Sequence, residues 1–235
     1  MIKKMLALMF VVFSVASLAF AAKSYVVDTP SSGILSYGSY TTGFRFFSNG
    51  GIISKINFGV FKLLNIGLSW ELDQFVGDKQ VKVATPTLQV KLRVYEGNMI
   101  LPVAAIGYDG QGYFFDPGEK KYLQKDRGLY FVVGREFFIE GLMFNVGINI
   151  NAFLKPKLYG FVNATALLYK EAVYFMAEYD NIGDYRDTRL NLGLRFAFTE
   201  YIDADCIIRD CWGKDDKNSR ISNERIFKVN YYGKF

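Results

Sequence analysis

Alternation of apolar and polar side chains with a period of two residues is the feature that most constrains how this chain folds. In one segment, Ile66, Leu68 and Trp70 fall on one face, whereas Gly67 and Ser69 fall on the other. Successive side chains of a β-strand point to opposite sides of the sheet. Each such segment therefore predicts a strand with one apolar face and one polar face.

The pattern recurs in about twelve segments, which clusters of Gly, Asn, Asp or Lys residues separate. The expected strands are residues 39–47, 52–60, 65–73, 86–95, 100–109, 127–136, 142–152, 158–168, 172–180, 188–198, 202–210 and 224–235. The fifth, sixth and eighth segments alternate less regularly, so a count of ten or eleven strands stays open. The predicted fold class is all-β.

The connections between the expected strands alternate in length. Odd-numbered connections include three long ones, residues 74–85, 110–126 and 211–223, whereas even-numbered connections are short. Short turns at one end and longer loops at the other are typical of a barrel in an outer membrane. The first connection is tight and contains Asn49 and Gly50, a pair that favours the positive φ angles of a hairpin turn.

A sheet in water alternates as well, so other features must decide between water and membrane. The polar face holds mostly Gly, Asn, Ser and Thr, with only a modest number of charges. No apolar run after residue 22 approaches the roughly 18 residues of a spanning helix, whereas a tilted ten-residue strand crosses roughly 25 Å of apolar bilayer. Because an open sheet edge does not survive in hydrocarbon, we predict a closed antiparallel transmembrane β-barrel over residues 39–235. It has about twelve strands, with ten as the smaller alternative.

Aromatic residues gather near the ends of the expected strands, at Phe46, Trp70, Tyr108, Tyr179 and Phe198. Aromatic rings are favoured at the interface between membrane and water, which agrees with the predicted barrel. Ordinary packing beneath loops is the other explanation for these positions.

Residues 1–22 have the pattern of a secretory signal peptide. Two lysines precede an apolar stretch over residues 5–20, and small side chains at Ala19 and Ala21 match the positions that a signal peptidase reads. We expect cleavage after Ala21 or Ala22, with an uncleaved anchor helix as the alternative. The next segment, residues 23–38, has no strand pattern. It is expected either to lie in the periplasm as a flexible lead-in or to fold into the lumen as a small plug.

The final segment resembles the insertion signal of bacterial outer-membrane barrels. Apolar and aromatic side chains share one face of it and end at the terminal residue, namely Phe227, Val229, Tyr231 and Phe235. A second resemblance is to a group of uncharacterised, porin-like outer-membrane proteins, and four stretches carry it: Asp28-Thr29-Pro30, Gly38-Ser39-Tyr40, Phe44-Arg45-Phe46-Phe47 and Asn49-Gly50-Gly51. These resemblances imply a barrel in the outer membrane of a Gram-negative type envelope, and we expect it to be a monomer. Membrane lipid, lipopolysaccharide and the barrel-assembly machinery would be its partners. They imply no activity.

Several function classes are excluded or disfavoured by composition. Histidine is absent, which excludes Ser-His and Cys-His catalysis and His-ligated metal sites. The aspartates between residues 203 and 216 do not have the spacing of a calcium-binding loop. We therefore expect no enzyme activity, no metal and no cofactor. The formal net charge of +5 falls to about +3 without the signal peptide, which is too small an excess to indicate nucleic-acid binding.

The two cysteines leave two alternatives open. An exported chain enters an oxidising compartment, where Cys206 and Cys211 could pair. Five residues of extended strand would hold them too far apart, so a disulfide requires a turn directly after Cys206. Otherwise both residues stay as unpaired small hydrophobic side chains.

Charged residues on the polar faces are the candidate lumenal residues. Parity assigns nine bases and six acids to the inward face: Arg45, Lys55, Lys91, Arg93, Arg189, Arg195, Arg209, Lys228, Lys234, Glu71, Asp73, Asp109, Glu178, Asp203 and Asp205. In a narrow barrel these charges either pair across the lumen and fill it, or line an aqueous path. Both arrangements stay open.

The favoured function is a narrow passive channel for small polar solutes or ions, because a polar lumen would lie inside an apolar wall. The alternative is a closed structural or surface-interaction barrel whose outer loops bind a partner. If the lumen is open, the excess of three bases predicts a weak anion preference. Arg93 and Arg195 are the expected determinants, because they lie well within their strands.

Removal of Phe235 tests the insertion signal. We expect the variant to assemble several-fold less efficiently than the parent protein, because the proposed recognition motif ends at this residue. The measurement is the heat-modifiable fraction recovered in the outer membrane. Deletion of Lys79, a residue in the middle of a predicted loop, is the control and should leave assembly unchanged. Equal assembly of both variants would contradict the insertion signal.

Overall fold

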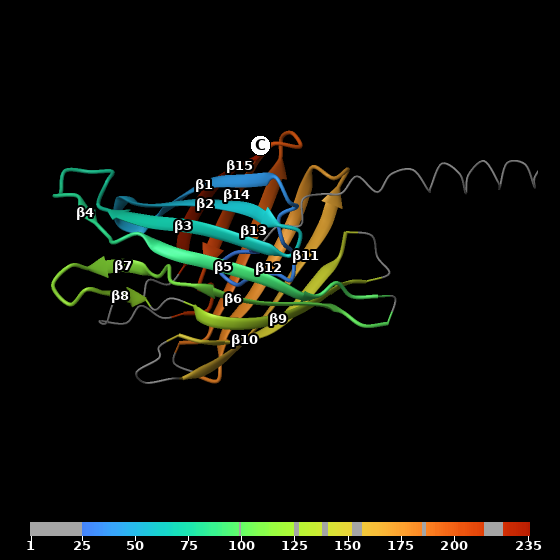
Figure 1. Ribbon diagram of the computed structural model, residues 1–235. Helices are drawn as coiled ribbons and strands as arrows, with labels where there is room; N and C mark the ends of the chain where they lie inside the picture. Colours follow the sequence, from blue (N-terminus) through green and yellow to red (C-terminus); the bar gives the residue numbers. More distant parts are fainter. Residues whose placement is uncertain are drawn as a thin grey trace, which may run out of the picture.

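Twelve antiparallel strands close into a barrel in the computed structural model of this protein (Figure 1). The barrel strands are β1 (Ser39–Phe47), β2 (Gly51–Phe61), β3 (Leu64–Asp73), β5 (Thr87–Tyr95), β6 (Val103–Asp109), β9 (Gly128–Glu136), β10 (Met143–Ile150), β11 (Leu158–Tyr169), β12 (Val173–Ile182), β13 (Arg189–Ala197), β14 (Ile202–Arg209) and β15 (Glu224–Lys234). The structure describes residues 25–98, 100–124, 127–137, 141–151, 157–184, 187–213 and 223–235.

The first and last barrel strands pair with each other and close the sheet. β1 runs antiparallel to β15 in a register from Ser39 opposite Lys234 to Phe46 opposite Phe227. On its other side β1 pairs with β2, and β2 pairs with β3. Each barrel strand therefore has a partner on both sides, and the main-chain hydrogen bonding runs around the whole ring.

The predicted fold class and strand count are confirmed. Each of the twelve expected strands is present, and its bounds differ from the expected ones by at most three residues. The tight first connection is a turn, η1 (Ser48–Gly50), with positive φ angles of 61° at Asn49 and 69° at Gly50. Three short strands were not predicted: β4 (Lys82–Val83), β7 (Tyr113–Asp116) and β8 (Lys121–Gln124). All three lie in long connections and are too short to show a period.

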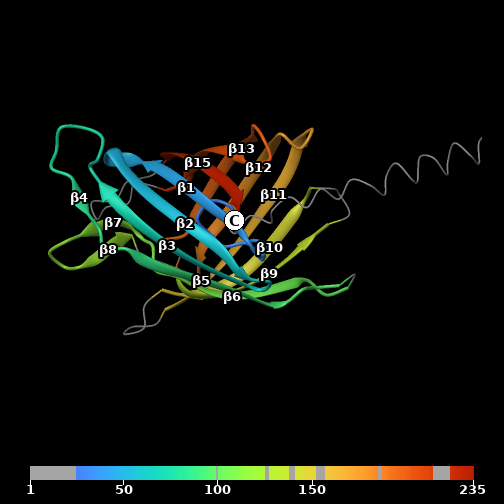
Figure 2. The same cartoon turned by 45° about the horizontal axis from the view of Figure 1, so that its top comes forward.

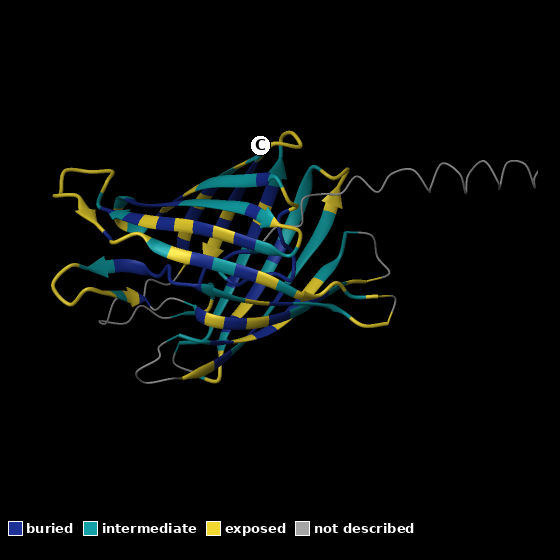
Figure 3. Ribbon diagram, in the orientation of Figure 1, coloured by how far each residue is buried: buried dark blue, intermediate teal, exposed yellow. Residues whose placement is uncertain are grey.

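Apolar side chains cover the outer face of the barrel. Burial alternates along the strands in Figure 3, with inward residues buried and outward residues exposed. Outward apolar residues that are between 38% and 47% exposed include Phe44, Leu68, Leu88, Leu92, Ile106, Phe131, Val146, Ile148, Leu194, Ile208 and Phe227. A belt of this extent is the surface that a bilayer stabilises and water does not. None of the described residues belongs to a helix long and apolar enough to cross a membrane.

Both cysteines are free thiols. Cys206 is exposed on the outer face of β14, and this strand continues to Arg209 before the chain turns. A disulfide to Cys211 would need the turn to follow Cys206 directly, so the disulfide alternative is wrong for geometric reasons.

Residues 25–36 lie inside the ring of strands, as the blue trace in Figure 2 shows. Val27 and Thr29 are completely buried. The chain reaches the lumen along β2, where the carbonyl oxygen of Ser36 lies so close to Gly59 that a Cβ atom there would sit 2.0 Å from it. We call residues 25–36 the lumenal segment. Of the two placements left open by the sequence, the structure has the one inside the barrel.

Substitution of Gly59 tests this close contact. We expect Gly59→Ala to lower the free energy of unfolding by about 2 kcal/mol, because the new methyl group displaces the segment or the strand. Urea titration of the refolded barrel, followed by tryptophan fluorescence, measures the change. Gly160→Ala is the matched control, since the nearest atom to a Cβ there is 3.4 Å away. Equal stability of the two variants would mean that the segment does not pack against β2.

Candidate functional site

Glu178, on the inner face of β12, anchors the lumenal segment. Its Oε2 atom accepts hydrogen bonds from the backbone N–H groups of Val27 (3.2 Å), Asp28 (2.9 Å) and Thr29 (2.7 Å), and from the Thr29 hydroxyl (2.6 Å). The Oε1 atom accepts from Asn191 Nδ2 at 2.7 Å. Five donors thus surround a carboxylate that is 1% exposed, and they replace the water it gives up on burial.

Asp28 of the lumenal segment binds cationic side chains of the wall. Its Oδ1 atom accepts from the Tyr113 hydroxyl at 2.6 Å and from the guanidinium of Arg45. Its Oδ2 atom accepts from Arg209 Nη1 at 3.4 Å. Burial alone would raise the pKa of Asp28, but the positive charges of Arg45 and Arg209 outweigh it and lower that pKa well below its usual range. The carboxylate is therefore ionised across physiological pH.

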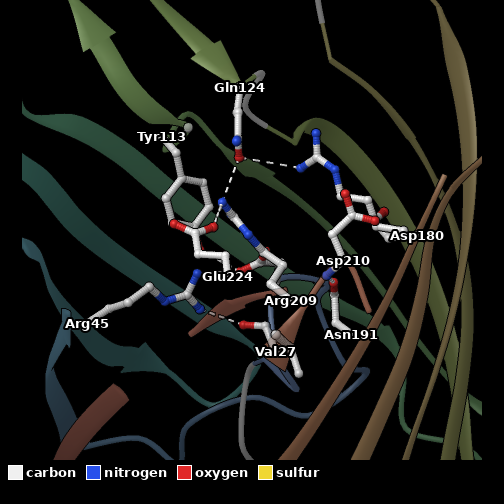
Figure 4. A network of polar contacts seen from close by, with 12 residues as sticks. Val27, Arg45, Tyr113, Gln124, Asp180, Asn191, Arg209, Asp210 and Glu224 are labelled. Carbon is white, nitrogen blue, oxygen red and sulfur yellow. Dashed lines mark hydrogen bonds and ion pairs between the residues drawn. The ribbon is translucent and has the colours of Figure 1, made fainter. Parts of the chain in front are cut away.

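The carbonyl oxygen of Val27 adds a further contact to the same cations. It accepts hydrogen bonds from Arg45 and from Lys228, and the bond from Arg45 is drawn in Figure 4. Asn163 fixes the next residues, because its Nδ2 atom donates to Thr29 Oγ1 at 2.8 Å and to the Pro30 carbonyl at 3.1 Å. Side chains of the wall thus supply hydrogen-bond partners to the backbone of the lumenal segment, which has almost no β-sheet hydrogen bonding of its own.

The β7–β8 hairpin projects from the opposite end, the end with the long connections, and only its base is buried in the lumen. Tyr113 and Phe114 are buried, and both rings stack edge-on against Phe47 with centroids 5.4 Å apart. The guanidinium of Arg209 lies 4.0 Å from the centroid of the Tyr113 ring. The hairpin and the lumenal segment therefore meet at the hydrogen bond between Tyr113 and Asp28.

Arg209 is held by acceptors of the wall and the hairpin as well. Its Nη2 atom donates to Gln124 Oε1 at 2.7 Å and to Glu224, as Figure 4 shows for Gln124. Glu224 also accepts from the hydroxyl of Ser48. The Arg209 side chain therefore keeps its position independently of Asp28.

Further ion pairs lie inside the barrel, between neighbouring strands and between parts of the wall that are not neighbours. Arg195 and Asp205 lie opposite each other on β13 and β14 and form a bidentate pair with distances of 2.6 and 2.8 Å. Arg127 makes a second bidentate pair with Asp180. Both pairs are almost fully buried, so the charge of each arginine is largely offset within the pair.

Most of the sequence-predicted lumenal residues are buried inside the barrel. At 9% exposure or less are Arg45, Glu71, Asp73, Lys91, Asp109, Glu178, Arg195, Asp203, Asp205, Arg209 and Lys228. Lys55 is partly exposed to the lumen and donates to Asp109 at 3.3 Å, while Arg93 and Arg189 are half-buried. Lys234 is exposed because it is the last residue of β15, at the rim of the barrel.

The sequence analysis missed lumenal carboxylates at Asp28, Asp180, Asp210 and Glu224, which have low side-chain exposure. Parity could have identified two of them, because Asp180 follows Glu178 by two residues and Glu224 precedes Lys228 by four. Asp28 carries no periodic signal. These acids remove the overall excess of three bases on which the predicted anion preference depended.

Two cavities flank the lumenal segment. The turn-end cavity, of about 90 Å³, lies toward the short turns, and its charged lining residues are four cations and one carboxylate: Arg45, Lys55, Arg195, Lys228 and Asp205. The loop-end cavity, of about 40 Å³, lies toward the long connections and has four cations and four carboxylates: Arg45, Lys55, Arg127, Arg189, Asp28, Asp109, Asp180 and Asp187. Both cavities are lined by Tyr25, Arg45, Ile53 and Lys55. The excess of positive charge therefore lies in the turn-end cavity, and two of its cations, Arg45 and Lys55, line both cavities.

Comparison with solved structures identifies the fold. The barrel is similar to the KdgM porin, with a TM-score of 0.54, 10% sequence identity, and coverage of 84% of this chain and 99% of that chain. Weaker likenesses are to the NanC porin (TM-score 0.45, 10% identity, 84% and 98% coverage) and to a Rh. blastica porin mutant (0.39, 13%, 79% and 56%). No protein-family model and no curated protein matches the sequence. The chain has the fold of a porin-like outer-membrane β-barrel.

Substitution of Glu178 tests its role as the anchor. We expect Glu178→Ala to reduce the exchange protection of amides 27–29 roughly 100-fold, equivalent to about 3 kcal/mol, because three buried donors lose their acceptor. Hydrogen–deuterium exchange with mass spectrometry measures this change. Glu171→Ala, at the exposed turn before β12, is the matched control and should leave the same amides protected. Unchanged protection of these amides in Glu178→Ala would show that Glu178 does not anchor the lumenal segment.

Proposed function

We propose that this protein is a narrow passive channel of the outer membrane for small polar solutes and ions. The path runs between the lumenal segment and the wall formed by β1 and β2. One observation carries the proposal: two polar cavities, one toward each end of the barrel, share the lining residues Tyr25, Arg45, Ile53 and Lys55. The proposed aqueous path joins the two cavities at these four side chains.

The location in the outer membrane belongs to the same proposal. The exposed apolar belt and the closed main-chain hydrogen bonding support it, because a bilayer requires both. The signal-peptide pattern and the final strand ending in Phe235 support it from the sequence. Lipid and lipopolysaccharide would surround a single barrel after the assembly machinery has inserted it.

The size of the cavities limits what can pass. A water molecule needs about 10 to 15 Å³ of such space, so the 90 Å³ and 40 Å³ cavities hold a few waters each. The path therefore suits ions and very small polar solutes while the lumenal segment stays in place. Larger solutes would require the segment to move.

The arrangement of charge favours anions. Four cations and one carboxylate line the turn-end cavity, and fixed positive charge lowers the entry barrier for anions. Arg45 and Lys55 replace the determinants that the sequence indicated. Arg45 and Lys55 line both cavities, although each has a carboxylate partner, whereas Arg195 lines the turn-end cavity alone and forms a bidentate pair with Asp205. Arg93 lines neither cavity.

The second candidate function is a closed barrel whose outer loops bind a partner. The extensive hydrogen bonding of the lumenal segment favours it, because Glu178 and Asn163 hold residues 27–30 with buried contacts. In this case the lumenal segment stays in place and blocks the lumen.

Recordings in planar bilayers separate these functions. We expect the refolded protein to give reproducible conductance steps with a weak anion preference. Lys55→Glu should shift the reversal potential in a salt gradient toward cation preference, by several millivolts, because it reverses a charge at the constriction. Lys79→Glu, in an exposed part of the long connection after β3, is the matched control and should leave the reversal potential unchanged.

Absence of conductance steps from heat-modifiable, folded protein would rule out the channel and leave the closed barrel. Conductance with the same reversal potential in Lys55→Glu and the parent protein would place the path elsewhere than between the lumenal segment and β2.

A further inference from the structure

The Asp28 carboxylate occupies an anion site that the rest of the barrel provides. Its ligands are Arg45 on β1, Arg209 on β14 and Tyr113 on the β7–β8 hairpin. Three separate elements thus converge on one carboxylate of the lumenal segment. Within the described ranges, Asp28 is the one carboxylate that pairs with Arg45.

Two of the three ligands are held in place by contacts that do not involve Asp28. Arg209 donates to Gln124 and Glu224. The ring of Tyr113 packs against Phe47. Arg209 and Tyr113 are therefore preorganised, and these two ligands stay in place when Asp28 leaves the site.

Departure of Asp28 would leave buried positive charge without a counter-ion. Arg45 would lose both the carboxylate of Asp28 and the carbonyl of Val27, and Lys228 would lose the same carbonyl. An unpaired buried charge is strongly unfavourable, so the segment leaves readily only when another anion takes its place.

Anions in the channel can reach this site. Asp28, Arg45 and Tyr113 all line the loop-end cavity, and Arg45 lines the turn-end cavity as well. Arg127 and Arg189 line the same loop-end cavity, where they pair with Asp180 and Asp187, so this approach holds as many cations as carboxylates.

We propose that Asp28 is an internal competitor of permeating carboxylates. A solute carboxylate exchanges with it on Arg45, Arg209 and Tyr113, and the exchange releases the lumenal segment and widens the path. This inference rests on the proposed channel function. The chemical class of the competing solute follows from the Asp28 carboxylate, which now occupies the site. Its two oxygens lie in one planar group and accept hydrogen bonds from three directions, and a spherical chloride ion does not reproduce this geometry.

Thiol labelling inside the lumenal segment reports its displacement. Ser32 is 2% exposed and differs from cysteine by one atom, so Ser32→Cys in a Cys206→Ser, Cys211→Ser background provides a buried probe. With the refolded barrel in vesicles, we expect a water-soluble maleimide to label it about fivefold faster in potassium acetate than in potassium chloride at equal ionic strength. The acetate ion binds the displaced state better, and this difference shifts the population.

Asp28→Asn in the probe protein removes the internal competitor. We expect fast labelling in both salts, whereas Asp78→Asn, in an exposed part of the connection after β3, should behave as the parent does. Asp28→Glu retains a carboxylate and should retain the dependence on acetate. Heat-modifiable migration confirms that each variant is folded before labelling.

Conductance of the same proteins distinguishes the two proposals. Acetate-dependent labelling with no conductance in either salt would keep Asp28 as a competitor and overturn the channel function. Equal labelling rates of the parent probe protein in acetate and chloride would overturn the competition, even if conductance steps are present. Equal labelling of Asp28→Glu in the two salts would overturn it as well, because the carboxylate is still there to be displaced.

Discussion

Closure of main-chain hydrogen bonding between β1 and β15 is the constraint on which the rest of this molecule depends. A wall exposed to hydrocarbon has no water to satisfy a free strand edge, so the sheet has to return to its first strand. The period of two then fixes which side chains face outward and which face the lumen. Because the outward positions are apolar, nearly all the charged side chains of the strands lie in the lumen. A barrel of twelve strands has a narrow lumen, so these charges lie close together.

Unpaired charges in such an interior would be unfavourable. The lumenal segment and the β7–β8 hairpin supply hydrogen-bond and ion-pair partners for them. The wall and the lumenal segment each provide a carboxylate. Glu178 of the wall accepts hydrogen bonds from backbone amides of the segment, and Asp28 of the segment accepts hydrogen bonds from guanidinium groups of the wall. The β7–β8 hairpin completes the arrangement from the other end through Tyr113. A segment and a loop without regular ladders therefore have fixed positions, since side chains rather than strands satisfy their backbones.

The sequence predicted what depends on periodicity and missed what does not. All twelve barrel strands follow from alternation, and Asn49-Gly50 predicts the first turn. The strands β4, β7 and β8 have two to four residues, too few for a period to appear. The position of the lumenal segment depends on distant partners such as Glu178 and Asn163, and no local pattern reveals such contacts. Apolar side chains at Val26, Val27, Ile34 and Leu35 are a local signal of burial, and all four are buried.

The site also shows why a count of inward charges predicts selectivity poorly. Parity places a residue inside the barrel but says nothing of its partner, and a bidentate pair such as Arg195 with Asp205 contributes little field to the rest of the lumen. Residues at the ends of strands and in the lumenal segment add carboxylates that a strand-based count omits, Asp28 among them. What acts on a permeating ion is the charge within a few ångströms of the constriction, because pairing and screening cancel the remainder. Arg45 and Lys55 carry that local charge, and the nearest opposing carboxylate to Arg45 belongs to the segment that narrows the path. In the proposed channel, Asp28 would therefore couple the width of the path to its electrostatic potential.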